Sequence, residues 1–531
     1  MRGFLASSIG VTCAAALALP LTPPAVAATA TPALGAEVAT SARTVAMSGR
    51  AAATSARAVA MSGRTVAMSG RTVAISAPVV TADGSAVRRT DAEPSVSGST
   101  QSLPLAPLTH DRTVDPPTEQ GLPRQDVRPF SLVGVIWDDP NAELHGRVQV
   151  RTRAVGTGTW SGWQDVETHN AEHAADPGTA EGTSAQVRGS TAPLWVGESD
   201  GVEVRVTASA AEGRSEKTPP GAGDPTQPSG TGVVSPLPAG LRLELVDPGD
   251  PAPAPEDPDG ASRPGFLTTG TGETAEALGA SGADTAASAV NAELAPLGAT
   301  EIPELGRAET ERELLALRGG ELTQEQRAKP HIGPRPRIVT RRGWGANESW
   351  REKQFTYTKK VKAAFVHHTA TGAKYTCKQV PSLIRGIYRY HVKSMGWRDV
   401  GYNFLVDKCG NIYEGRAGGA AKPVLGAHTR GFNSNSMGIA VLGSYGSAKP
   451  SGAAVRAIAR LTAWKLGLFG VNPRAKTYLK SGGGNLYRKG KNVRLNTISG
   501  HRDGFSTACP GLQLYRKLGT ARAAAARYQG R

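Results

Sequence analysis

Proline-rich and glycine-rich stretches, which cannot build a packed core, divide this chain of 531 residues into separate parts. The sequence contains 64 glycines and 37 prolines, and only 5% of its residues are aromatic. Such a composition is typical of a chain in which linkers occupy a large share. We therefore expect a multidomain protein with folded regions at 127–247 and 334–531, and with linkers at 28–126 and 248–333.

The first 27 residues have the pattern of a secretory signal peptide. Arg2 precedes an apolar run from Ile9 to Leu21, and Ala25-Val26-Ala27 resembles a small-residue cleavage site. This run is too short to cross a membrane, and no later run is long enough. We predict a secreted, extracellular protein without a membrane span.

Two regions before residue 330 have recognisable patterns. Residues 43–76 repeat the motif RTVAMSGR, which is typical of a low-complexity spacer, with a short β-rich surface segment as the alternative. Residues 127–247 contain short runs of alternating apolar and polar residues between glycine, proline and aspartate clusters. These runs predict an antiparallel β-sandwich without a catalytic constellation. Its tryptophans either pack in the core or stack on sugars.

The net charge is distributed unevenly along the chain. Residues 331–531 contain 36 lysines and arginines against 6 acidic residues, whereas residues 1–330 contain 25 against 39. A domain this basic attracts polyanions at long range, and outside a cell an anionic polymer of the cell wall is the expected partner. The basic residues are dispersed and no DNA- or RNA-binding motif is present, so we expect no specific nucleic-acid partner.

The cysteine count predicts one disulfide bond and one thiol with another role. One of the four cysteines lies in the predicted signal peptide, which leaves Cys377, Cys409 and Cys509, an odd number for an exported protein. Cys377 precedes a predicted helix at 381–392, and Cys409 lies in the turn of a predicted hairpin at 402–416. A disulfide bond between them would hold the helix to the hairpin.

Two histidines and one cysteine of the C-terminal region have the chemistry of zinc ligands. His367 ends a short apolar run that predicts a buried strand, and His501 is followed closely by Cys509. Two imidazoles and one thiolate supply three ligands and leave a fourth position on zinc open for water. The sequence therefore predicts the catalytic zinc site of a metal-activated hydrolase.

Five sequence blocks occur in order between residues 336 and 517. They are RRGWGA (341–346), FVHHTAT (365–371), GWRDVGYNFLVDKCGNIYEGR (396–416), GAHTRGFNSNSMGIAVLG (426–443) and SGHRDGFSTACPG (499–511). Together they resemble the peptidoglycan recognition protein family and its zinc-dependent N-acetylmuramoyl-L-alanine amidases. The resemblance implies an α/β domain whose central, mostly parallel sheet is flanked by helices. It also implies hydrolysis of the amide bond between N-acetylmuramic acid and L-alanine in peptidoglycan.

The same resemblance implies roles for individual residues. It places zinc on the two histidines and the cysteine described above, with the Tyr402 hydroxyl beside the metal, where it would stabilise an oxygen that gains charge. Thr507 stands where some relatives carry a catalytic lysine. Both His391 and Thr507 are candidate routes for the proton that the leaving amine must gain. The implied substrate contacts are His391, Arg398, His428 and Asn433.

A second function class stays open, namely a module that binds muramyl peptides without cleaving them. Some members of the resembled family lack the metal-binding cysteine and only bind. Cys509 and Tyr402 are both present in this chain, so we favour hydrolysis.

Overall fold

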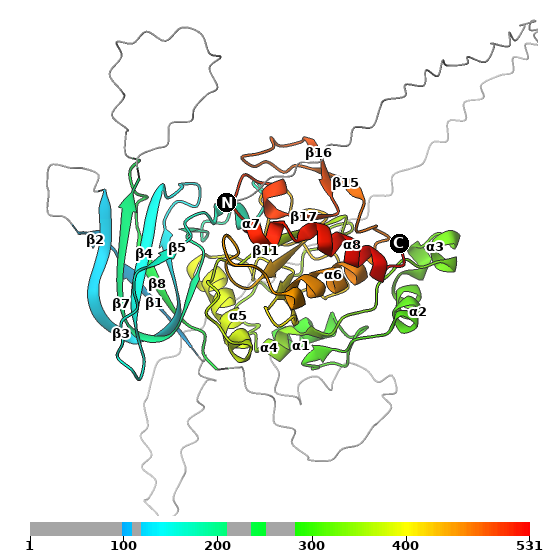
Figure 1. Ribbon diagram of the computed structural model, residues 1–531, viewed down its shortest axis with the longest axis horizontal. Coiled ribbons are helices and arrows are strands. Elements are labelled where there is room, and N and C mark those ends of the chain that lie inside the picture. Colours follow the sequence, from blue (N-terminus) through cyan, green and yellow to red (C-terminus); the bar gives the residue numbers. More distant parts are fainter. Residues whose placement is uncertain (1–97, 109–117, 210–234, 251–281) are drawn as a thin grey trace, which may run out of the picture. The chain divides into compact units, whose positions relative to one another are not determined.

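The computed structural model describes residues 98–108, 118–209, 235–250 and 282–531 (Figure 1). All of them fall within one compact unit, Thr90–Arg531. The predicted signal peptide and the repeat motif lie outside the described residues. Within the described part of the chain, no helix combines the length and the apolar character needed to cross a membrane.

The first described region is an antiparallel β module. Its strands are β1 (Ser99–Pro104), β2 (Ala106–Pro107), β3 (Glu119–Trp137), β4 (Gly146–Ala154), β5 (Gln164–Val166), β6 (Gly189–Ser190), β7 (Leu194–Ala208) and β8 (Arg242–Asp247). They form one hydrogen-bonded sheet in the order β1-β8-β3-β7-β4-β5, with β2 and β6 paired to β3. Register shifts along β3 against β7 allow this long strand to bend. The predicted antiparallel β fold is confirmed.

The core of the β module follows the alternation seen in the sequence, because every second side chain of a strand points to the same face. Its buried valines on β4 and β7 are Val148, Val150, Val202, Val204 and Val206. Trp137 belongs to the same core, whereas Trp195 packs with residues of the C-terminal domain. The arginine side chain of Arg124 covers Trp160, and those of Arg151 and Arg205 cover Trp163.

The structure corrects the predicted boundaries of both folded regions. Strands β1 and β2 and the start of β3 lie in the predicted linker 28–126. Helices α1 (Gly282–Ala289) and α2 (Arg307–Arg318) and strand β9 (Glu301–Ile302) lie in the predicted linker 248–333. β1 and β9 become strands by pairing with β8 and β10, and their short sequences alone do not predict this.

The C-terminal domain is built on a mixed sheet in the order β17-β11-β14-β12-β13-β10-β9. Its further strands are β10 (Ile338–Val339), β11 (Ala363–His368), β12 (Phe404–Val406), β13 (Ile412–Glu414), β14 (Ser436–Val441) and β17 (Ile498–Gly500), and a separate hairpin pairs β15 (Lys476–Lys480) with β16 (Asn492–Asn496). β11 runs parallel to β14 and β17, and β12 runs parallel to β14. The predicted, mostly parallel α/β sheet is therefore confirmed.

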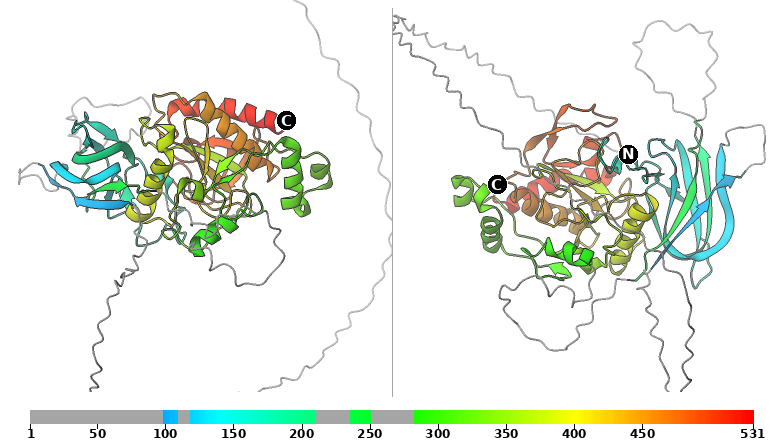
Figure 2. Two further views of the ribbon diagram at one scale, coloured as in Figure 1. Left: turned by 90° about the horizontal axis from the view of Figure 1, so that it is seen from below. Right: turned by 180° about the vertical axis from the view of Figure 1, so that it is seen from behind.

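Helices cover both faces of this sheet (Figure 2). The helices of this domain are α3 (Gln324–Ala328), α4 (Arg341–Trp344), α5 (Val380–Arg389), α6 (Gly452–Gly467), α7 (Leu512–Tyr515) and α8 (Leu518–Tyr528). Phe404 and Val406 of β12 pack with α6 and α8 on one face, and Leu405 packs with α5 on the other. Each strand thus has two apolar faces, as expected of a buried parallel sheet.

The predicted helix at 381–392 is present as α5, continued by a π-helical turn at Tyr390–Ser394. Pro381 lies in its first turn, where a missing backbone N–H costs no hydrogen bond. Leu383, Ile384 and Ile387 of α5 share one apolar cluster with Trp195 and other residues of the β module. The two folded regions are therefore joined by a common core.

The predicted disulfide bond between Cys377 and Cys409 is present, with the two Cα atoms 6.5 Å apart. It connects the turn before α5 to the turn between β12 and β13, which form the predicted hairpin. The bond therefore steadies the strand that follows Tyr402.

Replacing both Cys377 and Cys409 by serine should lower the free energy of unfolding by about 3–4 kcal/mol, because the closed loop restricts the unfolded chain. The loop spans 32 positions. Urea unfolding followed by tryptophan fluorescence measures the change. Wild-type protein treated with a reductant is the matched control and should unfold at the same urea concentration as the double variant. A loss below about 1 kcal/mol would contradict this account.

Candidate metal centre

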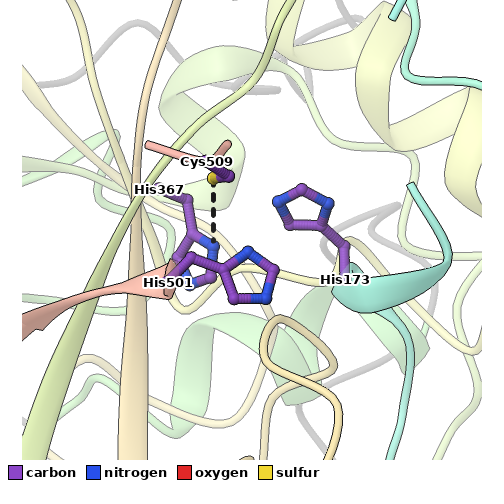
Figure 3. A group of neighbouring side chains, drawn as sticks. All are labelled: His173, His367, His501 and Cys509. Carbon is purple, nitrogen blue, oxygen red and sulfur yellow. Dashed lines mark hydrogen bonds between the residues drawn. The ribbon is translucent and has the colours of Figure 1, made fainter. Parts of the chain in front are cut away.

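Four side chains that can bind a metal meet in one buried cluster: His173, His367, His501 and Cys509. One potential ligand atom from each lies within 4.8 Å of the others. Figure 3 shows the ring of His173 pointing toward the rings of His367 and His501, with the Cys509 sulfur beside them. Three members are the predicted zinc ligands, and the fourth comes from the β module. We call this group the His₃Cys cluster.

Strand pairing brings the three C-terminal members together. His367 lies near the end of β11, and β17 pairs in parallel with β11 and ends at Gly500, directly before His501. The backbone N–H of Arg502 donates a hydrogen bond to the Cys509 carbonyl over 3.0 Å, which holds the intervening loop closed. His368 points away from the cluster, and its Nδ1 accepts a hydrogen bond from the Tyr445 N–H. As predicted, only one of the adjacent histidines joins the cluster.

The second ring nitrogen of His367 has a polar neighbour of its own. Its Nε2 lies 3.3 Å from the Thr429 hydroxyl, and its Nδ1 lies 3.8 Å from the Cys509 sulfur. A contact of this kind orients a ligand ring and selects its tautomer. His367 is thus held with Nδ1 toward the cluster.

The histidine rings of the cluster contain polar atoms without partners. Both ring nitrogens of His173 and both of His501 are buried without a hydrogen bond to any described residue. A buried donor or acceptor left unpaired costs about 1–3 kcal/mol, so several in one place indicate an ion. Zinc prefers nitrogen and sulfur ligands at about 2.0–2.3 Å in a tetrahedral arrangement. The residues present therefore fit zinc.

The electrostatic environment favours neutral imidazoles in the cluster. Burial lowers the pKa of His367 and of His501 well below the ordinary value, so both rings are in the form that binds a metal. Burial also raises the pKa of the Cys509 thiol well above its ordinary value. A bound dication reverses this effect, because a coordinating thiol loses its proton.

Tyr402 lies beside the cluster, as predicted. Its ring centre is 5.6 Å from that of His367 and 5.9 Å from that of His173. Burial raises the pKa of the Tyr402 phenol well above its ordinary value, so it keeps its proton and can act as a hydrogen-bond donor.

His428 and His391 lie near the cluster but outside it. The His428 ring centre is 5.2 Å from that of His367, its Nδ1 contacts the Thr429 hydroxyl, and its Nε2 has no partner among the described residues. The His391 Nδ1 accepts a hydrogen bond from Gly401, and its ring packs on Trp397. Burial lowers the pKa of each of the two imidazoles to about 3.

The remaining predicted site residues contact the β module. The Asn433 side-chain amide donates to Asp176, the Arg398 backbone N–H donates to Glu181, and the Thr507 hydroxyl donates to Glu172. These three acidic residues all belong to the loop between β5 and β6.

The contribution of the β module was missed by sequence reasoning. The expected site had three protein ligands and a fourth position open for water, and the module was expected to carry no catalytic constellation. Instead, His173 supplies a potential fourth ligand from a loop without apolar periodicity. Two histidines, His169 and His173, stand close together in this loop and were the one local signal.

A pocket of about 280 Å³ continues from Asn433 away from the cluster. The β5–β6 loop forms one wall of it through Asp176 and Glu181. Arg398 and Arg416 belong to the other walls, so the pocket is lined by both folded regions.

Comparisons with known proteins support a chain of two parts. Residues 87–229 match the family described as Rv3811 N-terminal galactose-binding domain-like, and residues 357–512 match the family described as N-acetylmuramoyl-L-alanine amidase. Peptidoglycan-recognition protein SC2 of Drosophila simulans is 31% identical over 183 residues, which are 34% of this chain and 85% of that protein.

Two further similarities are more limited. The N-acetylmuramoyl-L-alanine amidase of Homo sapiens is 36% identical over 126 residues, which are 23% of this chain and 21% of that protein. The solved structure of Drosophila PGRP-LB is 24% identical, covers 34% of this chain and 92% of its own, and has a TM-score of 0.27.

Replacing Cys509 by serine removes the thiolate ligand of the cluster, so it should weaken zinc binding by more than the roughly 10–100-fold that loss of an outer-shell partner costs. Competition with a chromophoric chelator measures the affinity. Stripping the metal from the parent protein should lower its unfolding temperature, and added zinc should restore it, because the ion stabilises the form that binds it. His169→Ala, at an exposed position of the same chain, is the control. Equal zinc affinity in Cys509→Ser and the parent would refute the assignment.

Proposed function

Because this chain belongs to the peptidoglycan-recognition protein family, we propose that it hydrolyses the amide bond between N-acetylmuramic acid and L-alanine in peptidoglycan. The observation that carries this proposal is the meeting of His367, His501 and Cys509 in one buried cluster beside Tyr402. The match of residues 357–512 to N-acetylmuramoyl-L-alanine amidase supports it.

Each residue around the cluster has a defined task in this proposal. Zinc, when bound, supplies a Lewis acid that polarises a carbonyl and a water molecule of lowered pKa. His367 and His501 lie at the ends of paired strands, which hold their rings rigidly in place. The Tyr402 phenol donates a hydrogen bond to the substrate oxygen as charge develops on it.

Polar residues around the cluster would position the substrate. His428 has a buried ring nitrogen without a partner among the described residues, and Asn433 and Arg398 line the adjoining pocket. For the proton that the leaving amine gains, His391 and Thr507 both stay candidates. The His391 ring centre is 5.9 Å from that of Tyr402, and the Thr507 hydroxyl accepts a hydrogen bond from the Cys509 N–H.

We infer a place of action outside the cell, at the wall. The signal-like first 27 residues support export, and the strongly basic region 331–531 supports attraction to anionic wall polymers. This attraction weakens as salt rises, because mobile ions screen exposed charges.

A non-catalytic muramyl-peptide-binding module is the second candidate. One observation favours it: with His173, the cluster has four protein residues, which is the ligand number of a structural zinc site. The presence of Cys509 and Tyr402 favours hydrolysis. Product analysis separates the two candidates.

Incubating the full chain with purified peptidoglycan should release stem peptides that begin with a free L-alanine amine, and chelation should stop the release. Mass spectrometry of the soluble products identifies the broken bond. Tyr402→Phe should slow the release by about 10²–10³-fold with zinc affinity unchanged, because one donor to the charged oxygen is lost.

Tyr478→Phe is the matched control for this experiment, since Tyr478 is 58% exposed on β15 and has no role in the proposed mechanism. Stem-peptide release by Cys509→Ser at the parent rate would rule out the zinc mechanism. Tight binding of muramyl peptide with no product, by every form of the chain, would favour the second candidate.

A further inference from the structure

A loop of the β module occupies the site proposed for the substrate. The loop lies between β5 and β6 and includes the short 3₁₀ turn Ala171–His173. We call residues 170–182 the inserted segment. It contains three acidic residues and no lysine or arginine, and it contacts a domain in which basic residues greatly outnumber acidic ones.

The first part of the inserted segment contacts the metal centre. The ring centre of His173 lies 4.6 Å from that of His501 and 5.3 Å from that of His367. Glu172 is buried beside it and accepts a hydrogen bond of 2.8 Å from the Thr507 hydroxyl. The segment therefore reaches both the predicted metal ligands and a predicted catalytic residue.

The middle of the segment accepts both hydrogen bonds that the Asn433 side-chain amide can donate. The Asn433 amide nitrogen donates to Asp176 over 2.7 Å and to the Ala174 carbonyl over 3.0 Å. Its amide oxygen accepts from the backbone of His428 and Thr429. Since an amide has two donor hydrogens, Asn433 has none left for a substrate while the segment is in place.

The end of the segment forms a buried ion pair. Glu181 accepts two hydrogen bonds, of 2.6 and 2.8 Å, from the Arg416 guanidinium, and both side chains are more than nine-tenths buried. The Arg398 backbone N–H donates to the same carboxylate over 3.3 Å. Paired, bidentate geometry of this kind gives strong and specific contacts. The segment is thus fastened at both ends.

The apolar interface between the two folded regions extends well beyond the segment, of which the partly buried Ala174 packs against it. Leu132 and Trp195 of the β module share an apolar cluster with Ile384 of α5. Most of this cluster lies outside the segment, so its contacts do not require the segment to stay in place. Gly178, in the middle of the segment, is exposed and has open space around it.

We propose that the inserted segment holds this protein in a latent state, in which His173 is the fourth zinc ligand and three acidic residues cover the residues proposed to act on the substrate. Glu172, Asp176 and Glu181 contact Thr507, Asn433 and Arg398, which we call the substrate groove. This inference rests on the proposed function. A catalytic zinc keeps one position for water or substrate, whereas four protein ligands close the site. The segment has to leave, by cleavage or by displacement, before a muramyl peptide binds.

The latent state has a quantitative consequence for binding. When only a fraction of molecules has an open groove, the apparent dissociation constant rises by the inverse of that fraction. Comparing an opened form with the parent chain thus measures how completely the segment closes the site.

Replacing His173 by alanine in the full-length protein should open the fourth metal position. With cobalt(II) in place of zinc, the visible absorption spectrum reports acetohydroxamate binding. The apparent dissociation constant of His173→Ala for acetohydroxamate should be at least about tenfold lower than that of the parent chain. His169→Ala is the matched control, because His169 belongs to the same loop but is exposed. Equal affinity of the parent and His173→Ala for this probe would overturn the proposal.

Cutting the segment tests the same proposal without changing any contact residue. A protease recognition sequence inserted between Gly178 and Thr179 lets one preparation be compared before and after cleavage. Cleavage should increase both acetohydroxamate binding to the cobalt form and stem-peptide release at least about tenfold. Unchanged values for both after complete cleavage would overturn the latent state.

The outcomes also separate this inference from the proposed function. If the opened forms bind acetohydroxamate more tightly but release no stem peptide, the latent state stands and the hydrolase proposal fails. If the uncut parent releases stem peptides as fast as the opened forms, the hydrolase proposal stands and the latent state fails.

Discussion

The parallel pairing of β17 with β11 is the constraint on which the metal centre depends. It places His501, the residue after β17, next to His367 near the end of β11, although the two are far apart in the sequence. Gly438 on the neighbouring β14 leaves room for the His428 ring, because a Cβ at position 438 would lie 2.4 Å from that ring. The sheet thus determines which side chains converge, and the loop to Cys509 adds the sulfur.

The second constraint is the close contact of the β module with α5 and the turn after it. The Tyr390 hydroxyl donates to the Thr191 carbonyl over 3.1 Å, and a Cβ at Gly134 would lie 2.3 Å from that hydroxyl oxygen. The Ser394 hydroxyl donates to Glu244 over 2.7 Å. These contacts fix the module close to the metal centre, so that its β5–β6 loop reaches the groove.

The features that depend on contiguous motifs could be predicted from the sequence. The strand before His367, the helix after Pro381 and the disulfide bond of Cys377 follow from local pattern and residue chemistry. The short strands β1 and β9 could not, since they acquire their structure by pairing with distant strands. Nor could the fourth member of the cluster, because the contact between Glu172 and Thr507 joins residues 335 positions apart and no local pattern links them.

The contacts of the inserted segment also determine what can displace it. If Glu181 leaves, Arg416 loses its ion-pair partner, and removing one partner of a buried pair costs up to about 3–5 kcal/mol. If Asp176 leaves, the Asn433 amide loses an acceptor, which costs about 1–3 kcal/mol more.

Opening is therefore an exchange of partners. A ligand that brings an anionic group to Arg416 and an acceptor to Asn433 offsets both costs, whereas an uncharged glycan offsets only the cost at Asn433. The contacts that close the groove are thus the same ones that select an acidic ligand, and latency and selectivity have a single physical origin.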